Sequence, residues 1–260
     1  MSADLELALQ ALELADRITL SAFRRPSLAV ETKADSSPVT EADRATEVAI
    51  RELIARERPA DAVLGEEMGS TGSGARRWFI DPIDGTVNFV HGIPVWATLL
   101  GLEVDGSMQL GAVSAPALGR RWWAERGEGA FAAAPQGRAE RVHVSSVAAL
   151  SGSGISSASI ADFPEPERVV ELAQKVKRDR GFGDFWSHML VAEGACEVGL
   201  DPVVSVWDIA PLQVIVEEAG GKFTDFAGTR RLDGGSALSS NGLVHDDVVA
   251  ALSGSRPTGP

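Results

Sequence analysis

The chain has 260 residues, of which 44% are hydrophobic and 23% are charged, the composition of a globular protein large enough for one or two domains. Its formal net charge of −13 argues against a nucleic-acid-binding surface and against adhesion to anionic membranes. Its single cysteine, Cys196, excludes an internal disulfide and a cluster of soft metal ligands, so we expect it to be packed in the core.

The sequence shows no feature of an exported or membrane protein. Residues 1–4 lack the basic and apolar regions of a signal peptide. No run of about 18 apolar residues, the length needed to cross a bilayer, occurs anywhere in the chain. We therefore expect a cytoplasmic protein.

Two amphipathic helices are predicted in the first quarter of the chain. Apolar residues recur at helical spacing over residues 5–23, and Pro26 ends this first helix. The second helix covers residues 40–57, with Thr40 as N-cap and Asp43 at the third helical position. These two residues form a capping-box pattern, in which each side chain accepts a hydrogen bond from the backbone N–H of the other.

Short strands and loops follow the second helix. Residues 61–65 predict a strand that delivers Glu66 and Glu67 at its end. The Gly/Ser-rich residues 69–74 predict a mobile loop, and residues 77–80 predict the strand that leads into the next motif. An antiparallel meander of three further strands is predicted at residues 95–104, 108–115 and 120–125.

The rest of the chain alternates between helices and strands, which predicts stacked α and β layers in two halves, residues 1–145 and 146–260. Asp184 is the predicted N-cap of one helix, and Gly220 with Gly221 ends another. The remaining strands are predicted at residues 28–32, 130–133, 141–144, 154–157, 196–200, 222–225 and 237–239. The remaining helices are predicted at residues 166–176, 184–193, 207–219 and 245–252.

The central motif is Trp-Phe-Ile-Asp-Pro-Ile-Asp-Gly-Thr-Val-Asn-Phe at residues 78–89. Its two carboxylates, Asp81 and Asp84, stand among apolar residues without a nearby Lys or Arg, and burying such a pair is costly unless a cation lies between them. Mg²⁺ takes oxygen ligands of this kind. Pro82 bends the chain so that both acids turn toward one point, and the Gly-Thr pair then begins a short helix that suits a phosphate. The alternative is an ordinary turn that caps a helix.

Acidic strings elsewhere complete a pattern. Gly-Glu-Glu at residues 65–67, Val-Thr-x-x-Asp at residues 39–43 and Trp-Asp-Ile-Ala at residues 207–210 accompany the central motif. Together with Glu-Ala-Gly-Gly at residues 218–221, they resemble the inositol monophosphatase family of Mg²⁺-dependent phosphomonoesterases over nearly the whole chain. The resemblance implies a layered α+β or α/β fold, the α-β-α-β-α sandwich shared with fructose-1,6-bisphosphatase-like sugar phosphatases. It also implies a homodimer.

Within that family the chain most resembles the bacterial, actinobacterial-type histidinol-phosphate phosphatases. This closer resemblance rests on residues 95–97, 120–124, 183–185 and 205–208. It implies hydrolysis of L-histidinol phosphate to L-histidinol and phosphate, a step of histidine biosynthesis. An acidic protein that binds a phosphate ester needs positive charge at its site, and bound metal ions supply it.

The resemblance also implies which residues hold the metal. Two or three Mg²⁺ ions would be bound by four carboxylates and one backbone carbonyl, those of Glu66, Asp81, Asp84, Asp208 and Ile83. Glu67 would support these ligands without touching the ions itself.

The implied catalytic residues are Thr86, Asp43 and Glu66. Thr86, oriented by Asp43 and close to Glu66, would align and deprotonate the attacking water. Backbone N–H groups of Gly85 and Thr86 would receive the phosphate. Taken alone, Asp43 is an acid in the first turn of a helix, and Asp208 a helix cap. Val87 departs from the Lys, Thr or Ser that often follows the motif Thr in the family, which affects the phosphate side and not the metal ligands.

Substrate-binding residues are expected around two acids in the second half. Histidinol phosphate carries a primary amine and an imidazole, so Asp184 and Asp201 are candidates for pairing with a cationic substrate, with Gly183 and Phe185 beside them. The alternative is that Asp184 is only an N-cap and Asp201 only a turn residue before a proline. His91 is either part of an exposed loop or a minor contributor to the pocket.

Two other functions remain as alternatives to a histidinol-phosphate phosphatase. The first is an inositol-1-phosphate or broad sugar-phosphate phosphatase, which has the same chemistry and a different pocket. The second is a non-catalytic, metal-binding regulatory protein of the same fold. The presence of Thr86 and Asp43 argues against this second alternative, because binding metal alone would not require them.

Overall fold

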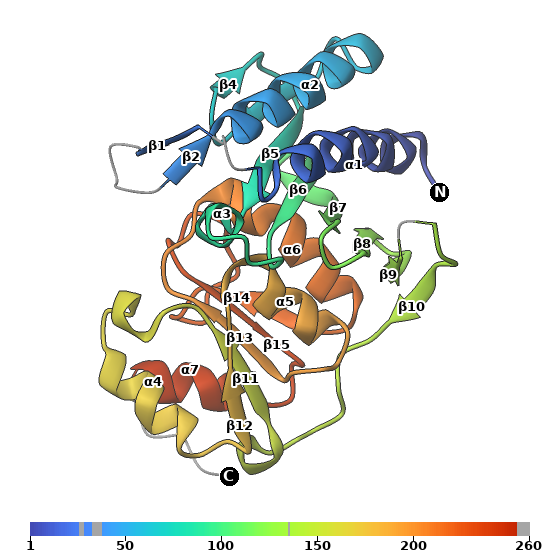
Figure 1. Cartoon of the computed structure of the whole chain (residues 1–260). Helices are drawn as coiled ribbons and strands as arrows, with labels where there is room; N and C mark the ends of the chain where they lie inside the picture. Colours follow the sequence, from blue (N-terminus) through green and yellow to red (C-terminus); the bar gives the residue numbers. More distant parts are fainter. Residues whose placement is uncertain (26–28, 33–37, 135, 254–260) are drawn as a thin grey trace.

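The computed structural model describes residues 1–25, 29–32, 38–134 and 136–253. It begins with two long helices that lie side by side, α1 (Ala3–Ala22) and α2 (Glu41–Glu57) (Figure 1). Thr40 caps α2, and both hydrogen bonds of the predicted capping box are present. Pro26 and Leu28, on which two predictions depended, lie outside the described residues. The described part of the strand predicted at residues 28–32 is β1 (Val30–Thr32), which pairs antiparallel with β2 (Pro38–Thr40).

An eight-stranded sheet forms the centre of the first half, with strand order β10-β9-β8-β7-β6-β5-β3-β4. Strands β3 and β5 run parallel, and the other neighbours run antiparallel, so the predicted meander is confirmed. The strands are β3 (Ala62–Gly65), β4 (Gly69–Thr71), β5 (Arg76–Asp84), β6 (Ala97–Val104), β7 (Ser107–Ala115), β8 (Arg120–Glu125), β9 (Gly129–Ala133) and β10 (Glu140–Val142). The short helix α3 (Thr86–Val90) follows β5.

The prediction of a loop over residues 69–74 is wrong for its first half. Residues Gly69–Thr71 form β4, which pairs with β3 at the edge of the sheet. Composition favoured a loop because glycine and serine are poor strand formers. Pairing with β3 and contacts from α2 overrule that local preference.

Helices cover both faces of the eight-stranded sheet. Side chains of β5 alternate between the two faces, as a pleated strand requires. Trp78 and Ile80 pack with Leu12 and Ile54 of α1 and α2. Phe79 belongs to a second cluster on the opposite face, which contains residues of α5 (Asp184–Ala192) and α6 (Val206–Glu218), and this cluster also contains the buried Cys196. The cysteine is therefore packed in the core, as expected.

A five-stranded sheet lies beyond α5 and α6, with strand order β12-β11-β13-β15-β14. Its strands are β11 (Gly154–Ser157), β12 (Arg178–Arg180), β13 (Val198–Asp201), β14 (Lys222–Thr224) and β15 (Ala237–Ser240). Its far face is covered by α4 (Pro166–Ala173) and α7 (His245–Ser253), through a cluster that includes Leu172, Leu200 and Val248. Two 3₁₀ turns, η1 (Leu150–Gly152) and η2 (Ile160–Asp162), complete the elements. Strands β2 and β12 were not predicted.

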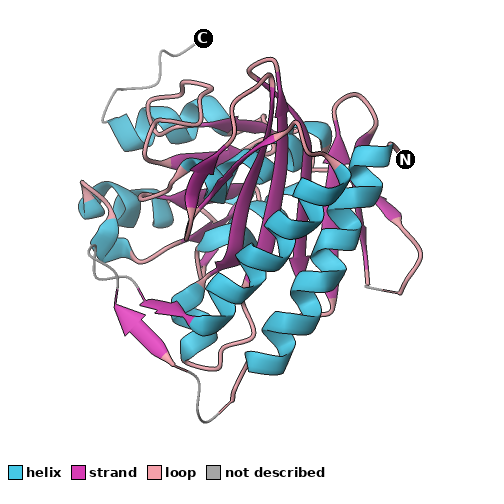
Figure 2. Cartoon of the chain, turned by 90° about the horizontal axis from the view of Figure 1, so that it is seen from above, coloured by secondary structure: helices cyan, strands magenta, loops and turns pink. Residues whose placement is uncertain are grey.

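Across the described residues the layers therefore follow the order α-β-α-β-α, with α5 and α6 between the two sheets (Figure 1). This confirms the predicted sandwich. Seen from above, two long helices lie in front of the strands (Figure 2). The division into halves at residue 145 remains a prediction, and one apolar cluster takes residues from both sides of it. No helix in the described ranges is both long and apolar enough to pass through a bilayer.

A glycine notch in the sheet sets the position of α6. Gly101 of β6 and Gly111 of β7 are cross-strand partners, and Pro211, inside α6, lies against both. A Cβ atom at position 111 would lie 2.1 Å from the Pro211 carbonyl oxygen, so only glycine fits there. The notch lets α6 approach the sheet closely at this point.

Candidate active site

The central motif is the C-terminal end of β5, and the strand runs four residues further than predicted. Pairing with β6 is regular as far as Asp81 opposite Leu99, and then the register shifts before Asp84 pairs with Ala97. This irregularity contains Pro82, which cannot donate a hydrogen bond to a neighbouring strand. The Pro82 carbonyl accepts a hydrogen bond from the Thr98 hydroxyl at 2.8 Å. The bend therefore lies inside the sheet, and both acids are buried.

Gly85 follows with a φ of +80°, in the left-handed region, and is the N-cap of α3. A Cβ atom here would lie 3.0 Å from the Val95 carbonyl oxygen and 3.2 Å from Asp184 Oδ2. Backbone conformation and space thus both require glycine. Thr86 then donates its hydroxyl proton to the Ile83 carbonyl at 2.9 Å.

The charges of neighbouring acids affect the ionisation of two of the predicted metal ligands, Asp81 and Asp208. Burial raises the pKa of Asp81 well above its usual range, and Glu66, Asp84 and Asp208 raise it further. Burial also raises the pKa of Asp208 to about 7, although the hydrogen bond from the Ser205 N–H opposes this. Such effects require the charges to lie close together. The structure therefore gathers Glu66, Asp81, Asp84 and Asp208 in one region.

The donor set fits a hard divalent cation, although the acids are not arranged around a single point. Nowhere in the described ranges do three or more His, Cys, Asp or Glu side chains already form a group that could hold a metal ion. Asp208 instead accepts the Ser205 N–H at 2.7 Å, and Asp84 the Phe185 N–H at 2.6 Å. Asp81 Oδ1 is buried with no hydrogen-bond partner among the described residues. A buried, unpaired carboxylate oxygen beside other carboxylates is a suitable ligand for Mg²⁺.

Asp43 connects the start of α2 to Thr86. Its Oδ2 accepts the Thr40 N–H at 2.8 Å and the Thr40 hydroxyl at 2.6 Å, while its Oδ1 lies 3.5 Å from Thr86 Oγ1. Burial raises the pKa of Asp43 to about 6, against these hydrogen bonds from Thr40. Asp43 is therefore the first-turn acid of the simpler interpretation, and its second oxygen also reaches the predicted catalytic residue.

The predicted substrate acids lie beside the same region. The Asp184 N–H donates to Asp201 Oδ2 at 3.0 Å, and the next N–H, that of Phe185, donates to Asp84. Asp201 is buried, and burial followed by the charge of Asp184 raises the pKa of Asp201 well above its usual range. The turn before α5 thus links a predicted metal ligand to both predicted substrate acids.

Two details of this turn correct the sequence analysis. Gly183, with a φ of +71°, is the N-cap of α5, while Asp184 is the first helical residue and caps nothing with its side chain. The predicted Asp N-cap is therefore wrong. Asp184 has a φ of +55°, which is uncommon for a residue with a side chain and is often retained at functional sites. Phe185 is fully buried, its ring packs against Trp122 and Trp186, and its backbone N–H is the group that contacts Asp84.

Three residues near the acids were missed. Asn88 donates its amide to the Val95 carbonyl at 2.9 Å and lies 3.5 Å from Asp184. His188 is buried and lines a cavity of about 30 Å³ with Asp184, Asp201 and Asp208. Glu47 lies one turn after Asp43 on the same face of α2. This spacing could have identified Glu47 from the sequence, whereas no such signal pointed to Asn88 or His188.

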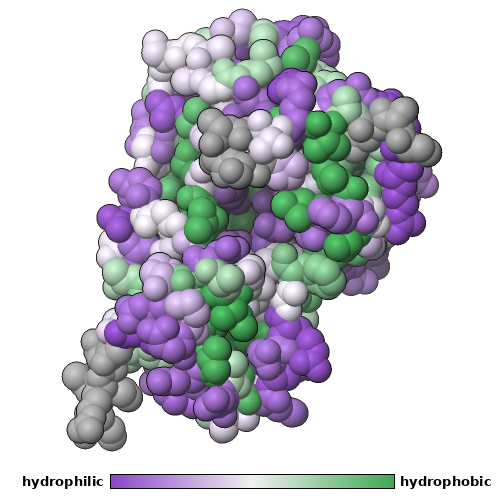
Figure 3. Space-filling view, turned by 60° about the vertical axis from the view of Figure 1, so that its left-hand side comes forward, coloured by the Kyte–Doolittle hydropathy of each residue, from purple (hydrophilic) through white to green (hydrophobic). Residues whose placement is uncertain are grey.

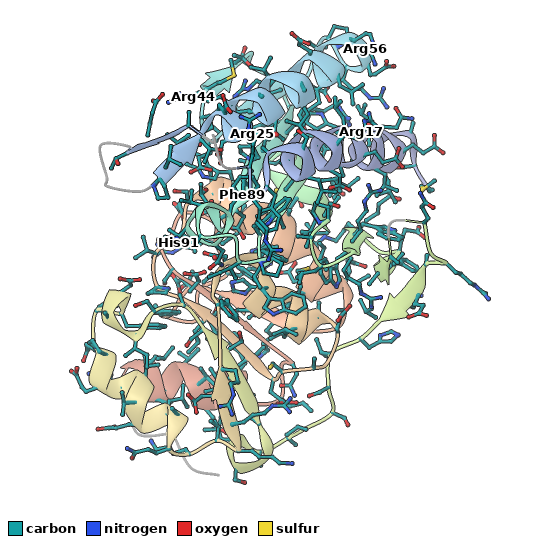
Figure 4. The ribbon with its side chains drawn as sticks, viewed as in Figure 1. Arg17, Arg25, Arg44, Arg56, Phe89 and His91 are labelled. Carbon is teal, nitrogen blue, oxygen red and sulfur yellow. The ribbon has the colours of Figure 1, made fainter. Side chains whose placement is uncertain are left out.

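The side of the molecule on which α3 lies in Figure 1 is hollowed near its centre, with hydrophobic and hydrophilic side chains around the depression (Figure 3). His91 ends α3 and is exposed, with its Nδ1 2.8 Å from the Val87 carbonyl (Figure 4). Phe89, on the same helix, packs inward against Phe23 and Trp96. Val87 is 56% exposed.

Comparisons with known proteins agree with this architecture. The model of the Inositol monophosphatase family matches residues 2–255. A histidinol-phosphatase of Mycobacterium tuberculosis is 49% identical, over 96% of this chain and 97% of that protein. A histidinol-phosphatase of Streptomyces coelicolor is 46% identical, over 96% of each. The solved structure of an IMPase of Thermotoga maritima superposes with a TM-score of 0.89 at 34% identity, covering 97% of this chain and 98% of that one.

Proposed function

This chain belongs to the inositol monophosphatase family and is a phosphoric monoester hydrolase, and we propose that its substrate is L-histidinol phosphate, which it converts to L-histidinol and phosphate. The observation that carries the proposal is the near full-length similarity to histidinol-phosphatases of two actinobacteria. The pair of acids beside the central motif, Asp184 and Asp201, supports it, because the substrate's amine is a cation.

We propose that Glu66, Asp81, Asp84 and Asp208, with the Ile83 carbonyl, hold Mg²⁺. The chemistry that Mg²⁺ supplies when bound is activation of water and positive charge beside the phosphate and leaving oxygens. The orphan oxygen of Asp81 and the all-oxygen donor set support this assignment. The number of ions, two or three, follows from the family resemblance alone.

The protein's own groups would then orient the attacking water. The Thr86 hydroxyl has two acceptors within reach of its single hydrogen, the Ile83 carbonyl at 2.9 Å and Asp43 Oδ1 at 3.5 Å, so its lone pairs remain available to accept a hydrogen bond. Glu66 lies next to β5 because its N–H donates to the Ile80 carbonyl at 3.1 Å. We propose that Thr86 accepts a hydrogen bond from the water and that Glu66 takes its proton. The N–H groups of Gly85 and Thr86 would bind the phosphate.

The decisive measurement is phosphate release from L-histidinol phosphate and from inositol 1-phosphate at equal concentration, with and without Mg²⁺. We expect Mg²⁺-dependent release, faster from L-histidinol phosphate. Faster release from inositol 1-phosphate would overturn the substrate assignment and favour the alternative. That alternative has its own support, because a 37% identical relative from Thermotoga maritima is named fructose-1,6-bisphosphatase/inositol-1-monophosphatase.

Replacing Asp184 by Asn tests the role of the substrate acids. Asn keeps the shape of the side chain and tolerates the left-handed φ of this position, unlike the β-branched Thr. Losing one charge-assisted contact, worth about 1.5 to 3 kcal/mol, should raise KM for L-histidinol phosphate roughly tenfold or more. KM for inositol 1-phosphate, which has no amine, should change less than about threefold by the same reasoning. Equal changes for both substrates would mean that Asp184 has only a structural role.

We further propose that the protein is a cytoplasmic homodimer. The dimer follows from the family resemblance, and the compartment from the biosynthetic substrate. Light scattering coupled to gel filtration tests the first point directly. A monomeric mass at micromolar concentration would contradict it.

A further inference from the structure

A buried polar row on α2 faces the predicted active site. Asp43, Glu47 and Arg51 follow one another at intervals of four residues, so their side chains lie on one face of the helix. Asp43 reaches Thr86, as described above. Glu47 contacts the turn that carries Glu66, and Arg51 contacts β4 just beyond that turn. We propose that Glu47 is a positioning residue, which fixes the backbone on both sides of Glu66 and so directs that carboxylate into the site. The proposal rests on the assignment of Glu66 made above.

The carboxylate of Glu47 is fully engaged by neighbouring donors. Its side chain has no exposed surface. Oε2 accepts the Glu67 N–H at 2.7 Å, and Oε1 accepts the Met68 N–H at 3.1 Å and Arg51 Nε at 2.7 Å. A buried carboxylate is costly unless it is paired and hydrogen-bonded, and here it is both. Breaking this arrangement therefore affects the backbone of residues 67–68 directly.

The other side of Glu66 is held by close contact. A Cβ atom on Gly65 would lie 2.3 Å from Glu47 Oε1, so any side chain there would displace the carboxylate. The Glu66 N–H itself donates to the Ile80 carbonyl of β5 at 3.1 Å. Glu66 is thus fixed between the strand that carries Asp81 and the carboxylate of Glu47. These contacts fix the backbone of Glu66 and therefore the direction in which its side chain leaves the chain.

Arg51 anchors the second strand of the β3–β4 hairpin to α2. Its Nη1 donates to the Thr71 hydroxyl at 2.9 Å, and its Nη2 to the Gly69 carbonyl. The side chain of Arg51 is only 10% exposed, so its pairing with Glu47 is largely shielded from water. One helix therefore positions both members of the proposed water-orienting pair: Thr86 through Asp43, and Glu66 through Glu47.

The test compares Glu47→Gln with a matched control, Glu52→Gln, at an exposed position of the same helix. The Gln amide places an NH₂ donor where the carboxylate accepted a backbone N–H. In the metal-free protein, hydrogen exchange at the amides of Glu67 and Met68 should quicken about tenfold or more, the loss of roughly one buried hydrogen bond. Exchange in the buried part of α2 around Ile54 should not change. The control should behave as the wild type.

Metal dependence gives the second readout. In Glu47→Gln the Mg²⁺ concentration for half-maximal turnover, and the dissociation constant for Mg²⁺ measured by calorimetry, should both rise roughly tenfold, because Glu66 is less well placed. KM for the phosphate ester should stay within about twofold, because the residues that contact the organic group are elsewhere. If Glu47 served only general stability, its replacement would not weaken Mg²⁺ binding while leaving KM for the phosphate ester unchanged.

Unchanged exchange at both amides, or unchanged Mg²⁺ affinity with faster exchange, would overturn the proposal. If Glu47→Gln does not fold, Glu47→Asp carries the same test, because it keeps the charge beside Arg51 and withdraws the oxygens by one methylene. The exchange and calorimetric measurements need no substrate. Their failure is therefore distinguishable from an error in the proposed phosphatase substrate.

Discussion

Replacing Asp84 by Asn should abolish turnover and, at the same time, raise the melting temperature of the protein in the presence of a chelator. Asp84 is buried, and burial, followed by the charges of Asp184 and Asp208, raises its pKa well above the usual range. The ionised form therefore lowers the stability of the fold, and Asn removes that charge. Asn also keeps an oxygen for the Phe185 N–H, so the link between the two halves survives.

Turnover at saturating Mg²⁺ should fall roughly a thousandfold or more, because a proposed ligand worth several kcal/mol of charge stabilisation is lost. Removing about 1 to 2 kcal/mol of electrostatic cost would raise the melting temperature by roughly 2 to 8 °C for a chain of this size. The gain should shrink as the pH falls, because wild-type Asp84 then becomes protonated and loses the same charge.

Calorimetry with and without chelator, beside a phosphate-release assay, checks both halves of this prediction. Asp105→Asn is the matched control, because Asp105 is an exposed turn residue for which neither quantity should change. A variant that keeps its activity would remove Asp84 from the metal site. A lower melting temperature of Asp84→Asn in the presence of chelator would mean that the Asp84 carboxylate stabilises the fold.

Gly111→Ala should be among the most destabilising single substitutions in the chain. The added methyl group would lie 2.1 Å from the Pro211 carbonyl oxygen, which is backbone and cannot move without shifting α6. Overpacking of this kind costs about 1 to 3 kcal/mol and more where backbone must shift, which corresponds to a fall in melting temperature of roughly 6 to 12 °C at the upper figure.

The same substitution should also lower activity in whatever protein stays folded, because Asp208 stands one turn before Pro211 on the displaced helix. Thermal melting and turnover per folded molecule measure the two effects. Gly74→Ala is the control, since a Cβ atom there would meet only the Ala60 carbonyl at an ordinary 3.6 Å. A melting temperature within about 2 °C of wild type would show that the packing between Gly111 and Pro211 can accommodate a methyl group.

Local signals predicted the structure where they had one interpretation. The capping box of Thr40 and Asp43 is correct because the three-residue spacing leaves few alternatives. The N-cap assigned to Asp184 is wrong because an acid suits the first helical position as well as the cap. Its glycine neighbour, Gly183, takes the positive φ of the cap.

Contacts between distant segments could not be predicted from periodicity. Three contacts join residues that share no local pattern. They are the hydrogen bond from Phe185 to Asp84, the pairing of Gly101 and Gly111 against Pro211, and the hydrogen bond from the Glu67 N–H to Glu47. The family resemblance identified the acidic residues of the site, but it did not explain which contacts hold them in position. Their metal-binding and catalytic roles remain predictions until the variants above are measured.

The place of α6 in the chain has a consequence for biosynthesis. The eight-stranded sheet is complete at Val142, but the helix that covers one of its apolar faces begins only at Val206. At about 5 to 20 residues per second, a ribosome needs on the order of 3 to 13 s to reach it. During that interval α6 cannot yet cover Phe79, Leu99 and Val113, which are buried in one cluster with its residues in the finished fold. Soluble yield should therefore depend on chaperone supply during translation, even for variants whose finished fold is as stable as the wild type.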